Sequence, residues 1–202
     1  MRLGRRKGLH FGKEKKKVNI SLVREVITWV VEILIALMLA FFLVHFVGMR
    51  TTVPGSSMEP TLENGQEILI DRFSYRVTKP KANDIVVFLP NGNERSRYYV
   101  KRVIAVPGDT VCIKNGAVYV NGELFQEEID AQAIEDAGLA EEEILLGDDE
   151  YFVLGDNRND SEDSRYANIG NIKSEYIIGK AWFIISPMKD FGFISSGAED
   201  EE

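Results

Sequence analysis

An apolar run, VITWVVEILIALMLAFFLVHFV, fills residues 26–47 and limits the fold of this chain more than any other segment. About 20 consecutive apolar residues suffice to cross the hydrocarbon core of a bilayer as a helix. Two polar side chains interrupt the run: Glu32, about two turns in, and His45, close enough to the end to reach the interface. The run therefore predicts a single N-terminal transmembrane helix in a lipid bilayer.

A cleaved secretory signal peptide is the alternative interpretation, but its apolar part spans only about 7–15 residues and ends at small residues. This run is longer and ends in VGMR at 47–50, so we interpret it as a retained anchor. The leader, residues 1–25, carries nine lysines and arginines against one glutamate up to residue 24. The positive-inside rule then predicts a cytoplasmic N-terminus and a body on the outer face of the plasma membrane.

The charge is divided unequally between the two sides of the run. The whole chain carries a net charge of −8, so the body beyond the basic leader must be strongly acidic. An acidic body argues against nucleic acid as a partner. The single cysteine, Cys112, cannot form an intramolecular disulfide, and no Cys/His spacing typical of a metal site is present. We therefore predict no metal and no cofactor, and we expect Cys112 to be a buried core residue.

Residues 48–194 contain short β-branched and aromatic runs separated by turn residues, which predict a mainly β body. An Asn115-Gly116 pair between two of these runs is typical of a tight hairpin. An acidic, alanine-rich insert at about 127–148 is expected to form a helix or a mobile segment, and an acidic tail occupies 195–202. The expected strands are 67–70, 84–89, 98–106, 111–113, 117–120, 151–154 and 177–185.

The body begins with PGSSMEPT at 54–61, in which Ser57 has the setting of a nucleophile. Pro54-Gly55 lets the backbone turn and approach a substrate, and Pro60 stiffens the exit. An ordinary Pro-Gly-Ser-Ser loop is the alternative. The body contains no histidine, because the two histidines of the chain are His10 and His45. If Ser57 is a nucleophile, its base is therefore an aspartate, a glutamate or a lysine.

Lys101 is the leading candidate for that base. It lies within YYVKRVIAV at 98–106, the most apolar setting of any lysine in the body. In a strand it would share a face with Tyr99, Val103 and Ala105. Lysine acts as a base only when burial lowers its pKa by several units, whereas arginine cannot lose its proton, which excludes Arg102. A solvated lysine on an edge strand is the alternative.

A third cluster, GDNRNDSEDSR, occupies residues 155–165. Loops this rich in Asp, Asn and Ser usually form turns through side-chain to backbone hydrogen bonds. Asp156, Asp160 and Asp163 also offer oxygen ligands for a calcium ion. Arg158 and Arg165 supply cations inside the loop, however, and the spacing of an EF-hand is missing. We favour a self-paired ionic loop that supports the site.

These blocks occur together and in a particular order: SMEPTL at 57–62, DIVVF at 84–88, YVKRV at 99–103, PGD at 107–109, and GDNR at 155–158 followed by SEDSR at 161–165. In this respect the chain closely resembles bacterial type I signal peptidases, membrane-bound Ser-Lys endopeptidases that remove signal peptides from exported proteins. The short insert and the single anchor resemble the Gram-positive form. The resemblance implies a single transmembrane helix followed by an extracytoplasmic antiparallel β-sheet catalytic domain.

The resemblance also implies the roles of individual residues. Ser57 matches the nucleophile and Lys101 the general base, while Ser161 matches a serine that orients the lysine. Asp163 and Arg165 match a supporting ion pair, with Asp156 and Arg158 in the same loop. The pockets for the alanine-sized residues before the cut, which explain an Ala-x-Ala preference, and the oxyanion site would involve Gly55, Ser56, Met58, Leu62, Tyr99 and Val100.

Two positions depart from the family pattern. Some members have an oxyanion-stabilising serine two residues before the nucleophile, where this chain has Gly55, so a backbone N–H or Ser56 must serve. Glu67 stands where an aspartate is usual. The implied partners are signal peptides of exported preproteins and the secretion translocon. The alternatives are a self-cleaving repressor-type Ser-Lys protease, which lacks an anchor, and a non-catalytic membrane-tethered assembly module on the same fold.

Overall fold

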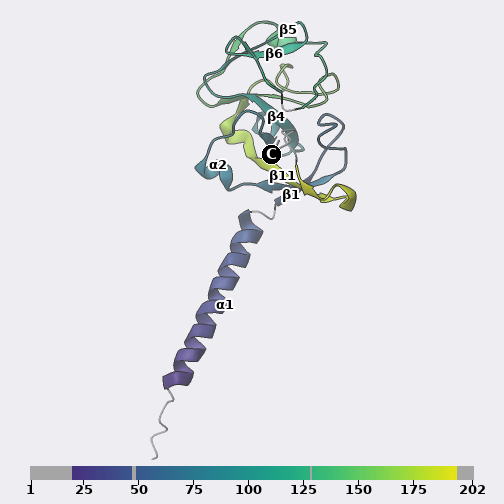
Figure 1. Cartoon of the computed structure of the whole chain (residues 1–202). Helices are drawn as coiled ribbons and strands as arrows, with labels where there is room; N and C mark the ends of the chain where they lie inside the picture. The colour runs from purple at the N-terminus through teal and green to yellow at the C-terminus, as the bar shows by residue number, and fades with distance from the viewer. Residues whose placement is uncertain (1–19, 47–48, 128, 195–202) are drawn as a thin grey trace, which may run out of the picture. The chain divides into compact units, whose positions relative to one another are not determined.

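The computed structural model describes residues 20–46, 49–127 and 129–194, without the side chains of residues 42–46. Most of the predicted basic leader, and all of the predicted acidic tail, lie outside these residues. The chain divides into two units, residues 1–41 and 42–202. The first unit contains all but the last turn of helix α1 (Ile20–Phe46), and the second unit holds the end of α1 and the β body (Figure 1).

Helix α1 begins six residues before the predicted start of the apolar run. Large apolar side chains are exposed all along its described part, including Trp29, Leu37 and Phe41. Three charged residues, Arg24, Glu25 and Glu32, also lie in it. No helix in the described part of the chain is both long and apolar enough to cross a membrane, so the predicted transmembrane helix is not confirmed.

The β unit is built around one large antiparallel sheet, as the strand pattern predicts. The strand order is β1-β2-β11-β3-β4-β9-β10, with β12 paired to β11. The strands are β1 (Met49–Thr52), β2 (Glu67–Asp71), β3 (Ile85–Phe88), β4 (Tyr99–Ala105), β9 (Glu150–Leu154), β10 (Ile172–Lys173), β11 (Ile177–Ser186) and β12 (Gly192–Phe193). The fold is therefore mainly β and antiparallel.

A smaller antiparallel sheet has the order β7-β6-β5-β8, with β5 (Thr110–Lys114), β6 (Ala117–Val120), β7 (Glu123–Leu124) and β8 (Ile144–Leu145). Its central hairpin turns at Asn115 and Gly116, which have φ values of 53° and 79°. These positive φ values explain the Asn-Gly pair and confirm the predicted turn. The short helical turns are α2 (Ser74–Val77), η1 (Pro90–Gly92), η2 (Gly138–Glu141), η3 (Ser174–Tyr176) and η4 (Met188–Asp190).

For the insert at 127–148 the structure differs from the predicted helix. In its described residues it forms the turn η2 and the strand β8 instead of an α-helix. Ile134, Ala140 and Leu146 are buried in the same apolar cluster as Ile113 of β5. Gly138 has a φ of 53°, and a Cβ there would lie 2.3 Å from the carbonyl oxygen of Arg165. Buried anchor residues and this close backbone approach tie the insert to the body.

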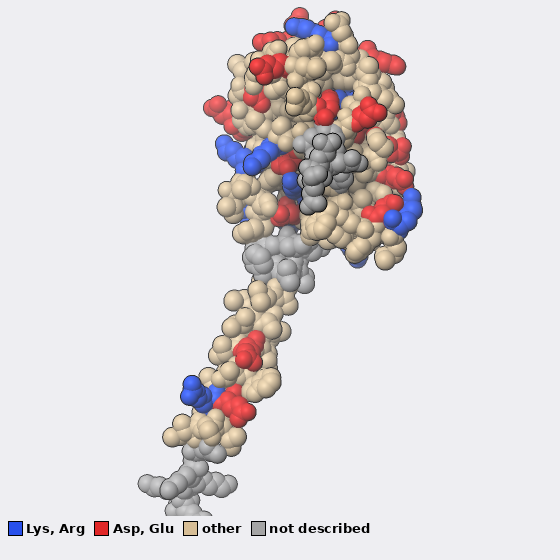
Figure 2. Space-filling view, viewed as in Figure 1, with Lys and Arg blue, Asp and Glu red and all other residues tan. Residues whose placement is uncertain are grey.

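Burial follows the strand pattern, while acidic side chains spread over the viewed surface of the β unit (Figure 2). Cys112 is buried in β5, as predicted. Strand β4 lies between β3 and β9 in the large sheet, and it is buried along nearly its whole length because its apolar side chains pack into the clusters that contain Val100, Val103 and Ile104. Its side chains are therefore removed from water on both faces, and this position decides the chemistry of the site.

Candidate active site

Ser57 lies in the loop between β1 and β2, as the sequence places it. The loop turns at Gly55, whose φ of 77° is in the left-handed region that glycine adopts without strain. The amide of Gly55 donates a hydrogen bond to Asn64 Oδ1 at 2.9 Å. The amide of Leu62 donates to the carbonyl of Met58 at 2.8 Å, which closes the turn after the serine. Both bonds fix the backbone on either side of Ser57.

Lys101 comes from the middle of β4, and its side chain ends at Ser57. The residue is 3% exposed, and its Nζ lies 2.6 Å from Ser57 Oγ. Burial lowers the pKa of Lys101 from 10.5 to about 8, although the nearby carboxylates of Asp163, Asp156 and Glu162 act in the opposite direction. The edge-strand alternative for this lysine is therefore wrong, because β4 is an interior strand.

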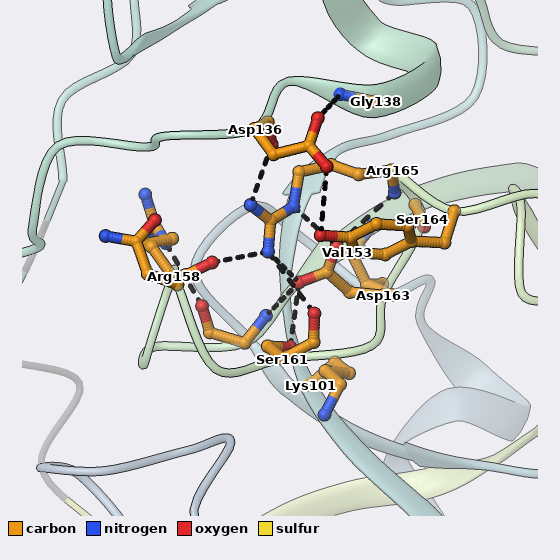
Figure 3. A network of polar contacts seen from close by, with 12 residues as sticks. Lys101, Asp136, Gly138, Val153, Arg158, Ser161, Asp163, Ser164 and Arg165 are labelled. Atoms are coloured by element: carbon orange, nitrogen blue, oxygen red, sulfur yellow. Dashed lines mark hydrogen bonds and ion pairs between the residues drawn. The ribbon is translucent and has the colours of Figure 1, made fainter.

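The loop 155–165 holds a network of polar contacts beside Lys101 (Figure 3). Asp163 receives hydrogen bonds from Ser161 Oγ at 2.8 Å and from Arg165 Nε and Nη2 at 2.8 and 2.9 Å. Arg165 Nη2 also donates to the carbonyl of Arg158 at 2.6 Å. Ser161 thus donates its hydrogen bond to Asp163, and within the described residues it makes no hydrogen bond to Lys101.

Two charged residues of the loop 155–165 pair with residues outside the loop, whereas the sequence predicted that the loop's charges pair with one another. Asp156 forms a bidentate pair with Arg102 of β4, with both distances at 2.8 Å and both side chains fully buried. Arg158 pairs with Glu127 of the insert at 2.6 Å through both terminal nitrogens. Arg102 and Glu127 are thus site-supporting residues that the sequence reasoning missed. An arginine inside an apolar strand is a usable signal, because buried arginines are almost always paired.

Gly155 allows the acidic loop to approach the serine loop closely. A Cβ at this position would lie 2.4 Å from the carbonyl oxygen of Ser57 and 2.2 Å from Ser161 Oγ. The amide of Asn157 donates to the Ser57 carbonyl at 3.1 Å, and its Nδ2 donates to the Ser56 carbonyl at 3.2 Å. The two loops are therefore held together by backbone contacts that leave no room for a side chain at residue 155.

Because Gly55 replaces the serine found in some members, the sequence left Ser56 or a backbone N–H as the second oxyanion donor. Ser56 Oγ donates its only proton to Asp160 Oδ2 at 2.6 Å, and the Gly55 amide donates to Asn64. Each of these donors thus already has an acceptor in this conformation. Neither Ser56 Oγ nor the Gly55 amide is therefore free for an oxyanion, and the second donor must be another backbone N–H.

A cavity of about 290 Å³ opens beside the Ser57–Lys101 pair. Tyr99 and Val100, both expected to line a pocket, lie in its wall. Met58 and Leu62 are instead fully buried beneath it, in the apolar cluster that includes Val53 and Val100. The complete lining consists of Val53, Pro54, Ser57, Arg97, Tyr99, Val100, Lys101 and Glu162. Val53, Arg97 and Glu162 were not anticipated from the sequence.

This geometry agrees with the comparisons to known proteins. The family model "Signal peptidase, peptidase S26" matches residues 26–186. The chain belongs to this family. It is therefore an enzyme of a family of serine proteases, which excludes the self-cleaving repressor alternative.

Among curated relatives, "Probable signal peptidase I-2" of Synechocystis sp. is 37% identical over 82% of this chain and 76% of its own length. "Signal peptidase I P" of Bacillus subtilis subsp. natto is 38% identical over 88% of this chain and 96% of its own. "Signal peptidase I" of Bacillus amyloliquefaciens is 33% identical over 88% and 97%. The relatives thus include Gram-positive forms, which the short insert and the single anchor suggested.

Proposed function

We propose that the chain is a membrane-bound serine endopeptidase that cleaves N-terminal signal peptides from exported preproteins after an Ala-x-Ala-type site. Ser57 is the nucleophile and Lys101 the general base. One observation carries this assignment: a buried lysine amine lies 2.6 Å from the hydroxyl of a serine at the wall of a cavity. The family membership of the chain supports the same reaction.

The reaction begins with Lys101 in its neutral form. Its lone pair accepts the proton of Ser57 Oγ as that oxygen attacks the scissile carbonyl carbon. The backbone N–H of Ser57 stabilises the resulting oxyanion. The Lys101 ammonium then protonates the departing amine, the peptide bond breaks, and an acyl-enzyme remains. Water repeats the sequence, with Lys101 again taking the proton, and releases the signal peptide.

The low pKa of Lys101 makes this chemistry possible near neutral pH. An ordinary lysine is almost fully protonated at pH 7, whereas one with a pKa of about 8 is roughly one-tenth neutral at that pH. The network of Ser161, Asp163 and Arg165 acts as a support. Because Ser161 Oγ donates its hydrogen bond to Asp163, the Ser161 oxygen keeps lone pairs with which to accept a hydrogen bond from the lysine N–H.

The lining of the cavity supports the proposed substrate preference. Val53, Val100 and Tyr99 give it apolar walls, while Met58 and Leu62 fill the space beneath. These apolar walls favour small apolar side chains before the cut, and the buried Met58 and Leu62 add no polar group to the site.

Location completes the proposal. We place the β unit on the outer face of the plasma membrane, with α1 as a single anchor and the N-terminus in the cytoplasm. The exposed apolar side chains of α1 support an anchoring role. The proposed partners are the lipid bilayer, signal peptides and the secretion translocon. Carbonate extraction of cell membranes tests the anchor, and recovery of the full chain in the soluble fraction would contradict it.

The decisive experiment uses the full chain in detergent with a purified preprotein that carries an Ala-x-Ala site. We expect cleavage after the second alanine, and its loss in Ser57→Ala and in Lys101→Ala. Lys114→Ala, which changes an exposed lysine at the end of β5, is the matched control and should cleave normally. Well-folded protein that leaves a range of preproteins uncut would favour a non-catalytic membrane module instead.

A further inference from the structure

A second cavity, of about 490 Å³, adjoins the first. The two cavities share two lining residues, Ser57 and Glu162. The other residues of the second cavity are Gly55, Ser56, Asn159, Asp160, Ser161, Tyr166 and Asn168. A peptide whose scissile bond lies over Ser57 must therefore also pass Glu162 as it crosses from one cavity to the other.

The two cavities differ in the groups they offer to a peptide. The first contains apolar walls, the amine of Lys101 and the guanidinium of Arg97, and its one carboxylate is that of Glu162 at the boundary with the second. The lining of the second includes two carboxylates, Asp160 and Glu162, and neither lysine nor arginine. If small apolar residues before the cut fill the first cavity, the residues after the cut enter the second, which carries negative charge.

Glu162 is the more available of these two carboxylates. Asp160 Oδ2 already accepts the proton of Ser56, whereas the hydrogen bond recorded for the Glu162 side chain is a long one, 3.5 Å from Tyr99 Oη. Glu162 is exposed, and in the part of the chain that the structure describes it takes part in no ion pair. Its neighbours Ser161 and Asp163 belong to the support network, so Glu162 is the residue of this segment that faces a substrate.

Building on the proposed function, we propose that Glu162 is a specificity-determining residue that selects substrates by the charge of the first residues after the cleaved bond. Its carboxylate favours lysine or arginine at these positions and disfavours aspartate or glutamate. Because Glu162 is exposed, water and salt screen its charge. We therefore expect a roughly two- to fivefold preference at low ionic strength, the size that exposed ion pairs produce.

A second effect of Glu162 must be separated from this one. Its negative charge also raises the pKa of Lys101, so its removal changes the fraction of neutral base and therefore the rate for every substrate. That change is common to all peptides and cancels in a ratio of rates. The ratio of kcat/KM for two peptides that differ only after the cut therefore reports the contact of Glu162 with substrate alone.

The experiment uses the full chain in detergent and two matched peptides with the same Ala-x-Ala site, one with lysine and one with glutamate as the first residue after the cut. For the unaltered chain we expect the lysine peptide to have the higher kcat/KM, with a ratio that falls towards one in high salt. Glu162→Gln should bring the ratio close to one at low salt. Glu162→Asp should keep part of the preference, since it keeps the charge.

Glu141→Gln is the matched control, because Glu141 is exposed in η2 and lines neither of the two cavities. It should leave the ratio unchanged. A preference that persists in Glu162→Gln, or a ratio near one in the unaltered chain, would overturn the role of Glu162 while cleavage itself upholds the proposed function. Folded chain that cleaves neither peptide would overturn both.

Discussion

The two faces of strand β4 show how differently burial acts on neighbouring cations. Lys101 and Arg102 are adjacent, and both are almost completely buried. Arg102 meets the Asp156 carboxylate in a fully buried bidentate pair, whereas the hydrogen bond of Lys101 Nζ is to the Ser57 hydroxyl. The arginine therefore has a counter-charge that offsets its desolvation, and the lysine lowers its pKa instead. Burial disfavours the charged form of both side chains. Whether the charge is kept depends on the group that each side chain contacts.

The largest expected effect comes from Lys101→Met, which removes the base and keeps an apolar side chain. Loss of a general base typically lowers the rate by roughly 10²–10⁴-fold, measured as cleavage of an Ala-x-Ala preprotein. The same variant should unfold at a higher temperature at pH 7. With a folded pKa of about 8 against 10.5 ordinarily, the lysine destabilises the fold fully below pH 8, and this effect disappears above 10.5. An unchanged or lower melting temperature at pH 7 would contradict the inference that buried Lys101, unlike the paired Arg102, destabilises the fold.

Arg102→Met should have the opposite effect on stability. It leaves the buried carboxylate of Asp156 without its cation, which destabilises a protein by about 3–5 kcal/mol. Denaturant unfolding measures the change. The double variant Arg102→Met with Asp156→Leu should recover much of the loss, because no uncompensated charge then remains. Equal stability of Arg102→Met and the unaltered chain would mean that the pair does not hold β4 to the loop 155–165.

Asp163→Ala tests the support network on the Lys101 side. The substitution removes the acceptor of both Ser161 and Arg165, so the buried Arg165 loses its ion pair. We expect activity to fall by at least tenfold through displaced geometry, since shifts of about 1 Å at a site can cost 10²-fold. Cleavage rate and thermal unfolding measured together decide the outcome. Both unchanged would remove this ion pair from the mechanism.

The smallest expected effect is a shift in pH dependence. In the unaltered chain kcat/KM should rise with pH through about 8, because Lys101 must be neutral. Glu162→Gln removes a charge that favours the ammonium, so the pKa of Lys101 falls and the rising limb moves to lower pH. Solvent screening keeps this shift to a fraction of a unit. A rate independent of pH between about 6 and 10 would contradict lysine as base.

Much of the β unit could be predicted from local pattern. The runs at 67–70, 84–89 and 177–185 lie within one residue of β2, β3 and β11 at every end, because β-branched residues between turn signals leave few alternatives. The insert at 127–148 could not be predicted in this way. Its acidic composition favours a helix, and burial of Ile134, Ala140 and Leu146 in the body overrides that preference.

At the site, the amino-acid sequence by itself determined which chemistry is open to the chain. A body without histidine leaves a nucleophilic serine dependent on another base, and apolar neighbours single out Lys101 among the lysines. Tertiary structure decided what those residues experience. Whether Lys101 is buried depends on β4 being an interior strand and on the Ser57 loop packing over it, and the partner of Arg102 depends on the β4–β9 register. Asp156 lies 54 residues from Arg102 in the chain, and a pairing over that distance is set by strand alignment rather than by local sequence.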